Sequence, residues 1–134
     1  MTEDDTHLVI GHTTSGAEAL AAQAPGAHIV SAFSTVPSEV LFSVFEGRTK
    51  GSRPDLVYCG DDIGAKQTAA GLIHDAGFNP VDMGGSSTAR YIEPFSLLVA
   101  QLAYGQREIR EFLRPEQVAD ALPARAPRLL QWDR

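Results

Sequence analysis

Two glycines, Gly11 and Gly16, bracket the stretch GHTTSG and have the spacing of the glycines in a phosphate-binding loop. In that motif, G-x-x-x-x-G-K-[ST], backbone amides wrap the phosphates and the lysine holds the terminal ones. Ala17 and Glu18 stand where the lysine and the hydroxyl residue are required, and a carboxylate at a helix start repels a phosphate. We therefore interpret residues 13–15, Thr-Thr-Ser, as the cap of a helix over residues 17–23.

The stretch GGSSTAR, residues 84–90, is the best local candidate for a ligand site. Its two glycines allow a ligand to approach the backbone closely. Ser86 and Ser87 stand at the start of a predicted helix, whose free amides favour anions, and Arg90 adds a positive group one turn later. The alternative is an ordinary helix cap in which Arg90 pairs with Glu93, its i+3 neighbour. The pattern leaves both interpretations open.

A third candidate segment follows the predicted strand over residues 28–33. Ser34, Thr35, Val36 and Pro37 cross from this strand to a helix. In open α/β sheets, ligands gather beyond the carboxyl ends of the strands, so these residues are expected to line a pocket there. An ordinary strand-to-helix turn explains them equally well.

Other reactive residue types favour structural roles. Asp61 and Asp62 occupy the anion position where a helix opens, and Cys59 has no basic neighbour to lower its pKa, so we expect two caps and a packed thiol. The four histidines show no metal-binding spacing, and we expect no metal site. Asp82 is either an acid–base group or, more commonly in this setting, a turn residue.

The composition of the 134 residues excludes several classes of function. The net charge of −6 argues against nucleic acids and anionic membranes as partners. No apolar run approaches the ~20 residues of a membrane span, and the acidic N-terminus does not look like a secretory signal. A single cysteine fits a reducing compartment. We therefore expect a soluble, cytoplasmic protein with a small-molecule ligand.

The elements that must position these residues alternate between strands and helices. Strands are predicted at residues 28–33, 55–59 and 78–82, and helices at 17–23 and 38–45. A third helix is predicted to start at residues 60–62 and to be closed by Gly77, and a long fourth helix follows residues 84–87 and ends near Gly105. This order predicts an α/β fold: an incomplete doubly wound, Rossmann-like parallel sheet of about three strands with flanking helices and a long C-terminal helix. Apolar stripes are predicted at Ile63, Ala70, Ile73 and Ala76, and at Ile92, Phe95, Val99 and Leu102.

The chain is predicted to divide near residue 106. Residues 1–106 carry the α/β pattern, and residues 107–134 carry a short helix over 115–122 and a proline-rich tail. A mean sheet has about five or six strands, so three strands indicate the second half of a doubly wound sheet.

Three segments together resemble a known family. They are IVSAFSTVPSEVLF (29–42), VYCGDDIGAKQTAAGLIHDAGFNPVDMG (57–84) and SSTARYIEPFSLLVAQLAYG (86–105), and GHTTSGAEALA (11–21) adds a fourth. In order and spacing they resemble the NADP oxidoreductases that depend on the deazaflavin coenzyme F-420. The wider group includes predicted dinucleotide-binding enzymes and the cytoplasmic domain of six-transmembrane metalloreductases. The family's G-x-G-x-x-G turn, which holds NADP, is absent from this sequence.

The resemblance implies roles for seven residues. Ser34, Thr35, Val36 and Pro37 match the segment that lies against the reacting rings, and Ser86, Ser87 and Arg90 match the second-cofactor side. Ser34 stands where the deazaflavin enzymes can have His and many relatives have Asn, which leaves the electron acceptor open. Hydride transfer in such proteins aligns two rings and excludes water, so we expect no catalytic acid or base.

Two hypotheses follow from the resemblance. In the first, the chain is a truncated or split portion of an NADP-dependent, deazaflavin- or flavin-type oxidoreductase that covers the hydride-transfer site. A partner chain then supplies the nucleotide-binding half, and this chain alone does not bind NADP tightly. In the second, the half-fold is a stand-alone homodimeric module that binds a small molecule, or a non-redox enzyme, and it associates through its open sheet edge.

Overall fold

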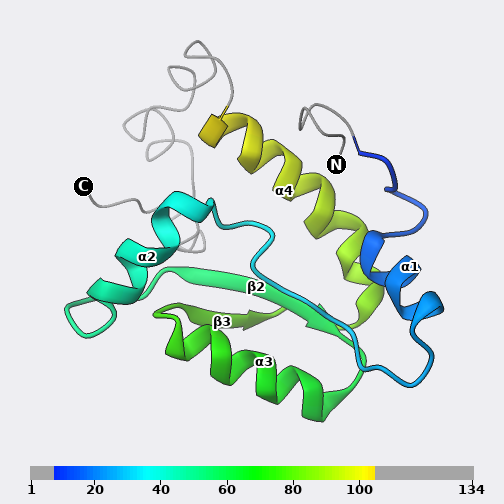
Figure 1. Cartoon of the computed structure of the whole chain (residues 1–134), viewed down its shortest axis with the longest axis horizontal. Coiled ribbons are helices and arrows are strands. Elements are labelled where there is room, and N and C mark those ends of the chain that lie inside the picture. Colours follow the sequence, from blue (N-terminus) through cyan, green and yellow to red (C-terminus); the bar gives the residue numbers. More distant parts are fainter. Residues whose placement is uncertain (1–7, 105–134) are drawn as a thin grey trace, which may run out of the picture.

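The computed structural model of the chain describes residues 8–104. Its elements, in chain order, are α1 (Gly16–Gln23), β1 (Val30–Ser31), α2 (Ser38–Gly47), β2 (Asp55–Gly60), α3 (Ile63–Asp75), β3 (Asn79–Asp82), the 3-10 turn η1 (Ser86–Thr88) and α4 (Ala89–Tyr104) (Figure 1). The predicted helix over 115–122, the tail and the boundary near 106 lie outside the described residues. None of the helices within residues 8–104 combines the length and apolarity that crossing a membrane requires.

The sheet has three strands in the order β1-β2-β3, which confirms the predicted α/β fold. β2 and β3 run parallel, with Asp55 opposite Asn79 at one end of the register. β1, however, pairs antiparallel with β2, Val30 lying opposite Gly60, so the prediction of an all-parallel sheet is wrong for this strand. Phe33 adopts a left-handed backbone (φ 65°), which turns the chain out of the strand and limits β1 to two residues.

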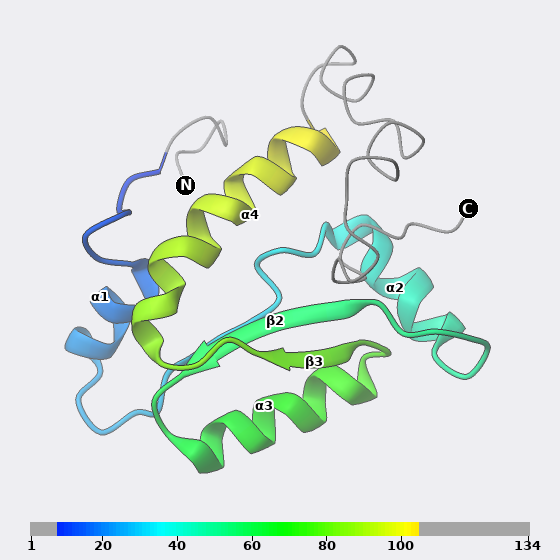
Figure 2. The same ribbon diagram turned by 180° about the vertical axis from the view of Figure 1, so that it is seen from behind.

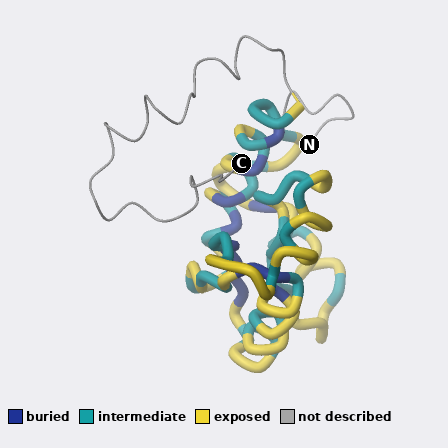
Figure 3. The backbone as a smooth tube through the Cα atoms, turned by 90° about the vertical axis from the view of Figure 1, so that its left-hand side faces the viewer, coloured by how far each residue is buried: buried dark blue, intermediate teal, exposed yellow. Residues whose placement is uncertain are grey.

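The two faces of β2 carry two apolar clusters. Leu56 and Tyr58 point to one face, where they pack with Ile73 of α3 and with Phe78. The alternate residues Val57 and Cys59 point to the other face, towards Ala89 and Ile92 of α4. The sheet therefore lies between α3 on one side and α1 with α4 on the other (Figures 1 and 2). Figure 3 shows the buried positions running through the interior between exposed helix surfaces.

Ser15, Asp62 and Gly77 define helix ends as predicted, whereas Asp61, also predicted as a cap, does not cap α3 and accepts a hydrogen bond from Ser86 N instead. Ser15 Oγ accepts a hydrogen bond from Glu18 N (3.1 Å) at the start of α1. Asp62 Oδ1 accepts one from Ala65 N (2.7 Å) at the start of α3. Gly77, with a left-handed φ of 100°, ends the α3 segment and leads the chain into β3.

The predicted apolar stripes are only partly buried. Ile63 is 70% exposed, because it is the first residue of α3 and lies beyond the packed part of the helix. α4 buries Ala89, Ile92, Ser96 and Ala100, so Ile92 is the one member of the predicted stripe that is buried, and Phe95 is 41% exposed. Three of these four are small residues, which let α4 approach the sheet closely and leave larger side chains at its flank.

β3 forms one edge of the described sheet. Asn79 N and Met83 N donate to Pro54 O and Tyr58 O on the β2 side, both at 2.8 Å. Because strand residues alternate in direction, Pro80 faces the open side, where its missing N–H removes a donor from the edge. This proline makes the β3 edge a poor template for pairing with another strand.

Candidate functional site

The N-terminus of α1 is filled by a carboxylate from α4. Glu93 Oε2 accepts a hydrogen bond from Gly16 N (2.7 Å), and Glu93 Oε1 accepts one from Ala17 N (3.0 Å). Ser15, whose side chain is fully buried, takes the next amide of this turn, that of Glu18. The glycine-containing loop is thus a helix cap, as predicted, and Glu93 holds the position that a phosphate would need.

Arg90 binds Glu18 rather than Glu93. Arg90 Nε donates to Glu18 Oε2 (2.8 Å), and Arg90 Nη2 donates to Glu18 Oε1 (2.6 Å), which gives a two-pronged ion pair between α1 and α4. The hydrogen bond from Arg90 is the main cause that lowers the pKa of Glu18. The guanidinium that was expected to face a ligand is therefore engaged by a side chain of α1.

Sequence reasoning missed both of these contacts between α1 and α4. Glu18 and Arg90 are 72 residues apart in the chain, so local spacing rules pair Arg90 with Glu93 instead. One signal was available: Arg90 and Glu93 are the only charged residues in α4, which is otherwise apolar or uncharged. Two charges within one turn of a packed helix indicate partners on a neighbouring element.

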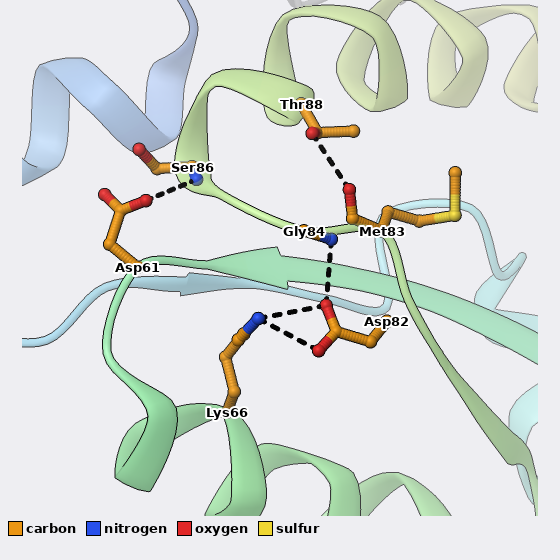
Figure 4. A network of polar contacts seen from close by, with 7 residues as sticks. All are labelled: Asp61, Lys66, Asp82, Met83, Gly84, Ser86 and Thr88. Carbon is orange, nitrogen blue, oxygen red and sulfur yellow. Dashed lines mark hydrogen bonds and ion pairs between the residues drawn. The ribbon is translucent and has the colours of Figure 1, made fainter.

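A second set of carboxylates holds the turn before α4 (Figure 4). Asp61 Oδ1 accepts a hydrogen bond from Ser86 N (2.8 Å), and Asp82 Oδ1 accepts one from Gly84 N (2.8 Å). Lys66 Nζ donates to both oxygens of Asp82, at 3.1 and 2.9 Å. Hydrogen bonds from Ser86 lower the pKa of Asp61, and that from Lys66 is the main cause lowering the pKa of Asp82. Asp82 is thus a turn residue paired with a lysine.

The glycines of this turn allow the close approach. Gly84 has a left-handed φ of 94°, which favours glycine. A Cβ atom on Gly85 would stand 3.0 Å from Asp61 Oδ1, so a side chain there would press on the carboxylate that holds Ser86. The double glycine therefore serves the contact with Asp61, and this carboxylate lies where an anionic ligand would approach the turn.

The segment from Ser34 to Pro37 lies elsewhere than expected. β1 runs antiparallel to β2, whereas β3 runs parallel to β2. The carboxyl end of β1 therefore points away from the side of the sheet at which the carboxyl ends of β2 and β3 lie. The expectation that these residues lie on that side is wrong. Instead, Ser34 Oγ lies 3.0 Å from Ser96 Oγ of α4, and Val36 packs against the cluster around Leu56.

The other predicted site residues lie either next to Ser34 or at the start of α4. Thr35 is half-buried next to Ser34, and Pro37 directly precedes α2. Ser86 and Ser87 lie in η1 at the base of α4, where Ser86 is bound by Asp61. The structure thus brings Ser86, Ser87 and Arg90 to one end of α4, and it places the Ser34 segment beside the middle of that helix.

The far end of α4 binds α2 through a tyrosine. Tyr104 Oη donates to Glu39 Oε2 (2.6 Å) and accepts a hydrogen bond from Ser38 N (3.2 Å). The hydroxyl of Tyr104 is the main cause that lowers the pKa of Glu39. Polar contacts therefore hold α4 at both ends, to α1 at its start and to α2 at its finish.

These groups limit the chemistry of the described residues. Cys59 is fully buried, and burial raises the pKa of its thiol, so it is a packing residue rather than a ready nucleophile. Within residues 8–104 no three His, Cys, Asp or Glu side chains gather in a way that could hold a metal ion. A carboxylate competes with an NADP pyrophosphate at both helix starts, because Glu93 accepts two amide protons at the start of α1 and Asp61 accepts that of Ser86 at the start of η1.

Comparison with known proteins relates part of the chain to a metalloreductase. No family model matches the chain. Over 86 residues, 64% of this chain, the sequence is 36% identical to the metalloreductase STEAP3 of Rattus norvegicus. That match covers 17% of the metalloreductase, so the chain spans a small part of the length of this relative. The likeness supports a distant link to the NADP-dependent oxidoreductases and does not bear on the deazaflavin branch.

Proposed function

We propose that this chain is a portion of an NADP-dependent oxidoreductase that covers the site of hydride transfer. The likeness to a metalloreductase carries the proposal, because it extends over 64% of the chain rather than over one short motif. The parallel β2-α3-β3 unit supports it, since a doubly wound fold is built from such units, and β1 departs from that pattern by running antiparallel. A deazaflavin or a flavin is proposed as the hydride acceptor.

The nucleotide-binding half is proposed to come from outside this chain. Two helix starts resemble phosphate-binding sites, and there Glu93 and Asp61 accept hydrogen bonds from backbone amides. These carboxylates occupy the positions that a pyrophosphate would need. A partner chain with a G-x-G-x-x-G turn would bind the pyrophosphate through free amides at its own helix start. The outer side of α4, with Tyr91, Phe95 and Leu98 exposed, offers an apolar surface for such a partner.

The proposed site residues act by position rather than by acid–base chemistry. Ser34, Thr35, Val36 and Pro37 are proposed to lie against the reacting rings and to exclude water from them. Ser86, Ser87 and Arg90 are proposed to face the second cofactor. Since Arg90 is bound to Glu18, a cofactor phosphate reaches it only by displacing that carboxylate.

Reconstitution tests this proposal. The purified chain is mixed with a separate chain that carries a G-x-G-x-x-G nucleotide-binding half, and NADPH oxidation is followed with flavin, deazaflavin or ferric iron as acceptor. We expect oxidation only when both chains are present, and we expect it to fall when Ser34 is replaced by a bulky residue, Ser34→Trp. A mixture that forms a complex, binds NADPH and oxidises it with none of these acceptors would contradict the proposal.

A second candidate is a self-associating module that binds a small molecule without redox chemistry. The exposed apolar side chains on α4 favour association, whereas Pro80 disfavours the β3 edge as the contact. Sedimentation distinguishes the two candidates: a homodimer that forms without any second chain favours the module, and a monomer that dimerises only with the nucleotide-binding half favours the oxidoreductase.

A further inference from the structure

The outer side of α2 carries three large apolar side chains that the described residues do not cover. Leu41, Phe42 and Phe45 are 38%, 67% and 42% exposed, and α2 contains no fully buried residue. Spacings of three and four residues place these side chains on one side of the helix, which we call the α2 face. The guanidinium of Arg48 lies 3.8 Å from the ring centre of Phe45 and shields only that ring.

The chain leaves the described region next to this face. Tyr104, the last described residue, is bound through its hydroxyl to Ser38 and Glu39 in the first turn of α2. Phe42 lies four residues after Ser38 and three after Glu39, which places it one turn further along the same side of α2. The thirty residues from 105 to 134 thus start beside Phe42.

Those residues have the composition and the reach to cover the α2 face. Ile109, Phe112 and Leu113 are their first large apolar residues. An extended chain covers about 3.3 Å per residue, so the five residues to Ile109 reach about 16 Å. The helix rise from Glu39 to Phe45 is only about 9 Å.

Charge favours the same contact. Residues 105–134 contain six arginines, no lysine and five acidic residues, whereas the chain as a whole carries −6. α2 contains two glutamates and no basic residue. The single excess positive charge of the segment is attracted to the two glutamates of α2, and Arg48 at the C-cap of α2, with Lys50 and Arg53 after it, partly offsets this attraction.

We propose that residues 105–134 of the same chain bind the α2 face, with Ile109, Phe112 and Leu113 packing on Leu41, Phe42 and Phe45. A tethered segment has a local concentration in the millimolar range, which exceeds that of a second copy at ordinary protein concentrations. The segment thereby covers an apolar surface other than the outer side of α4, which it leaves open for the nucleotide-binding partner.

Limited proteolysis of the full chain with trypsin tests the proposal, because Arg107 and Arg110 lie in the segment and neither precedes a proline. We expect Phe42→Asp to raise the cleavage rate at these arginines about tenfold or more, since cleavage follows the fraction of molecules with the segment released. Ile63→Asp, at a 70% exposed apolar residue of α3, is the matched control and should leave the rate unchanged. Circular dichroism of both variants checks that the fold is retained.

A second variant keeps the test independent of α2. Phe112→Asp lies in the segment itself and should raise the cleavage rate as Phe42→Asp does, while the double variant should add little beyond either single change. Equal cleavage rates in the parent, Phe42→Asp and Phe112→Asp would overturn the proposal. So would protection that increases with protein concentration together with a dimer in sedimentation, because a second copy would then cover the face.

Discussion

At the scale of residues, side-chain carboxylates accept hydrogen bonds from backbone amides at several turns and helix starts. Glu93 accepts the first two amides of α1, Asp61 accepts an amide at the start of η1, and Asp82 accepts one from Gly84 while binding Lys66. Apart from the local turn of Asp82 with Gly84, each of these contacts joins segments that the sequence alone leaves unconnected or connects differently. The caps at Ser15 and Asp62 could be predicted because a cap acts within three residues. Partners 72 or 77 residues away could not, because only the fold brings them together.

Removing the charge of Glu93 should destabilise the fold. Glu93→Gln keeps one acceptor but loses the carboxylate that two α1 amides share, and the expected cost is about 1 kcal/mol of unfolding free energy. Urea denaturation at neutral pH measures it. The control is Glu46→Gln on the exposed side of α2, for which no change is expected. Equal stability of the two variants would mean that Glu93 does not hold α1.

The paired carboxylates also predict a dependence of stability on pH. The pKa values of Glu18 and Asp82 lie below their ordinary 4.5 and 3.8 in the folded chain, chiefly through hydrogen bonds from Arg90 and Lys66. In this range the unfolded chain binds more protons, so stability increases with pH. The contribution is complete above about pH 4.5 and is lost as the pH falls through the lowered folded values.

Thermal unfolding as a function of pH measures this loss. The melting temperature of the parent should fall more steeply below pH 4.5 than that of Glu18→Gln, whose side chain cannot be protonated in this range. Parallel curves for the two proteins would show that the ion pair between Glu18 and Arg90 does not contribute to stability.

At the scale of elements, the order of strands and helices could be predicted from the sequence, but the direction of β1 could not. β2 and β3 are joined by α3, a thirteen-residue helix bounded by Asp62 and Gly77, and this is the usual pattern of a parallel pair. β1 could not be predicted as antiparallel, because periodicity gives extended backbone but no direction. Likewise, α4 packs through small residues, which hydrophobicity alone ranks below its exposed Phe95.

Two glycines near α3 should respond in opposite ways to replacement by alanine. Gly77 has a φ of 100°, and a Cβ there would stand 2.8 Å from Val44 O, so Gly77→Ala should cost more than about 1 kcal/mol. Gly71 lies inside α3 with nothing within 4 Å of an added Cβ. Gly71→Ala should therefore stabilise the chain by about 0.5–1 kcal/mol. Chemical denaturation of both variants tests the pair, and a shift of the same sign in both would contradict the described end of α3.

At the scale of the whole molecule, three strands and two apolar clusters make one layered α/β unit. The fold class was predictable because strands and helices alternate along the chain. The arrangement of the candidate site could not be predicted. The antiparallel β1 leads Ser34 to Pro37 away from the carboxyl ends of β2 and β3, where Ser86 and Ser87 lie. The likeness to a metalloreductase then links this unit to oxidoreductases that are much longer than the chain.

The central claim is that this chain covers a hydride-transfer site while a separate nucleotide-binding half holds NADP. Calorimetric titration of the isolated, monomeric chain with NADPH tests it most directly. With Glu93 and Asp61 occupying the amides at both helix starts, we predict no saturable binding in the micromolar range. Micromolar binding of NADPH by the monomer would contradict the claim.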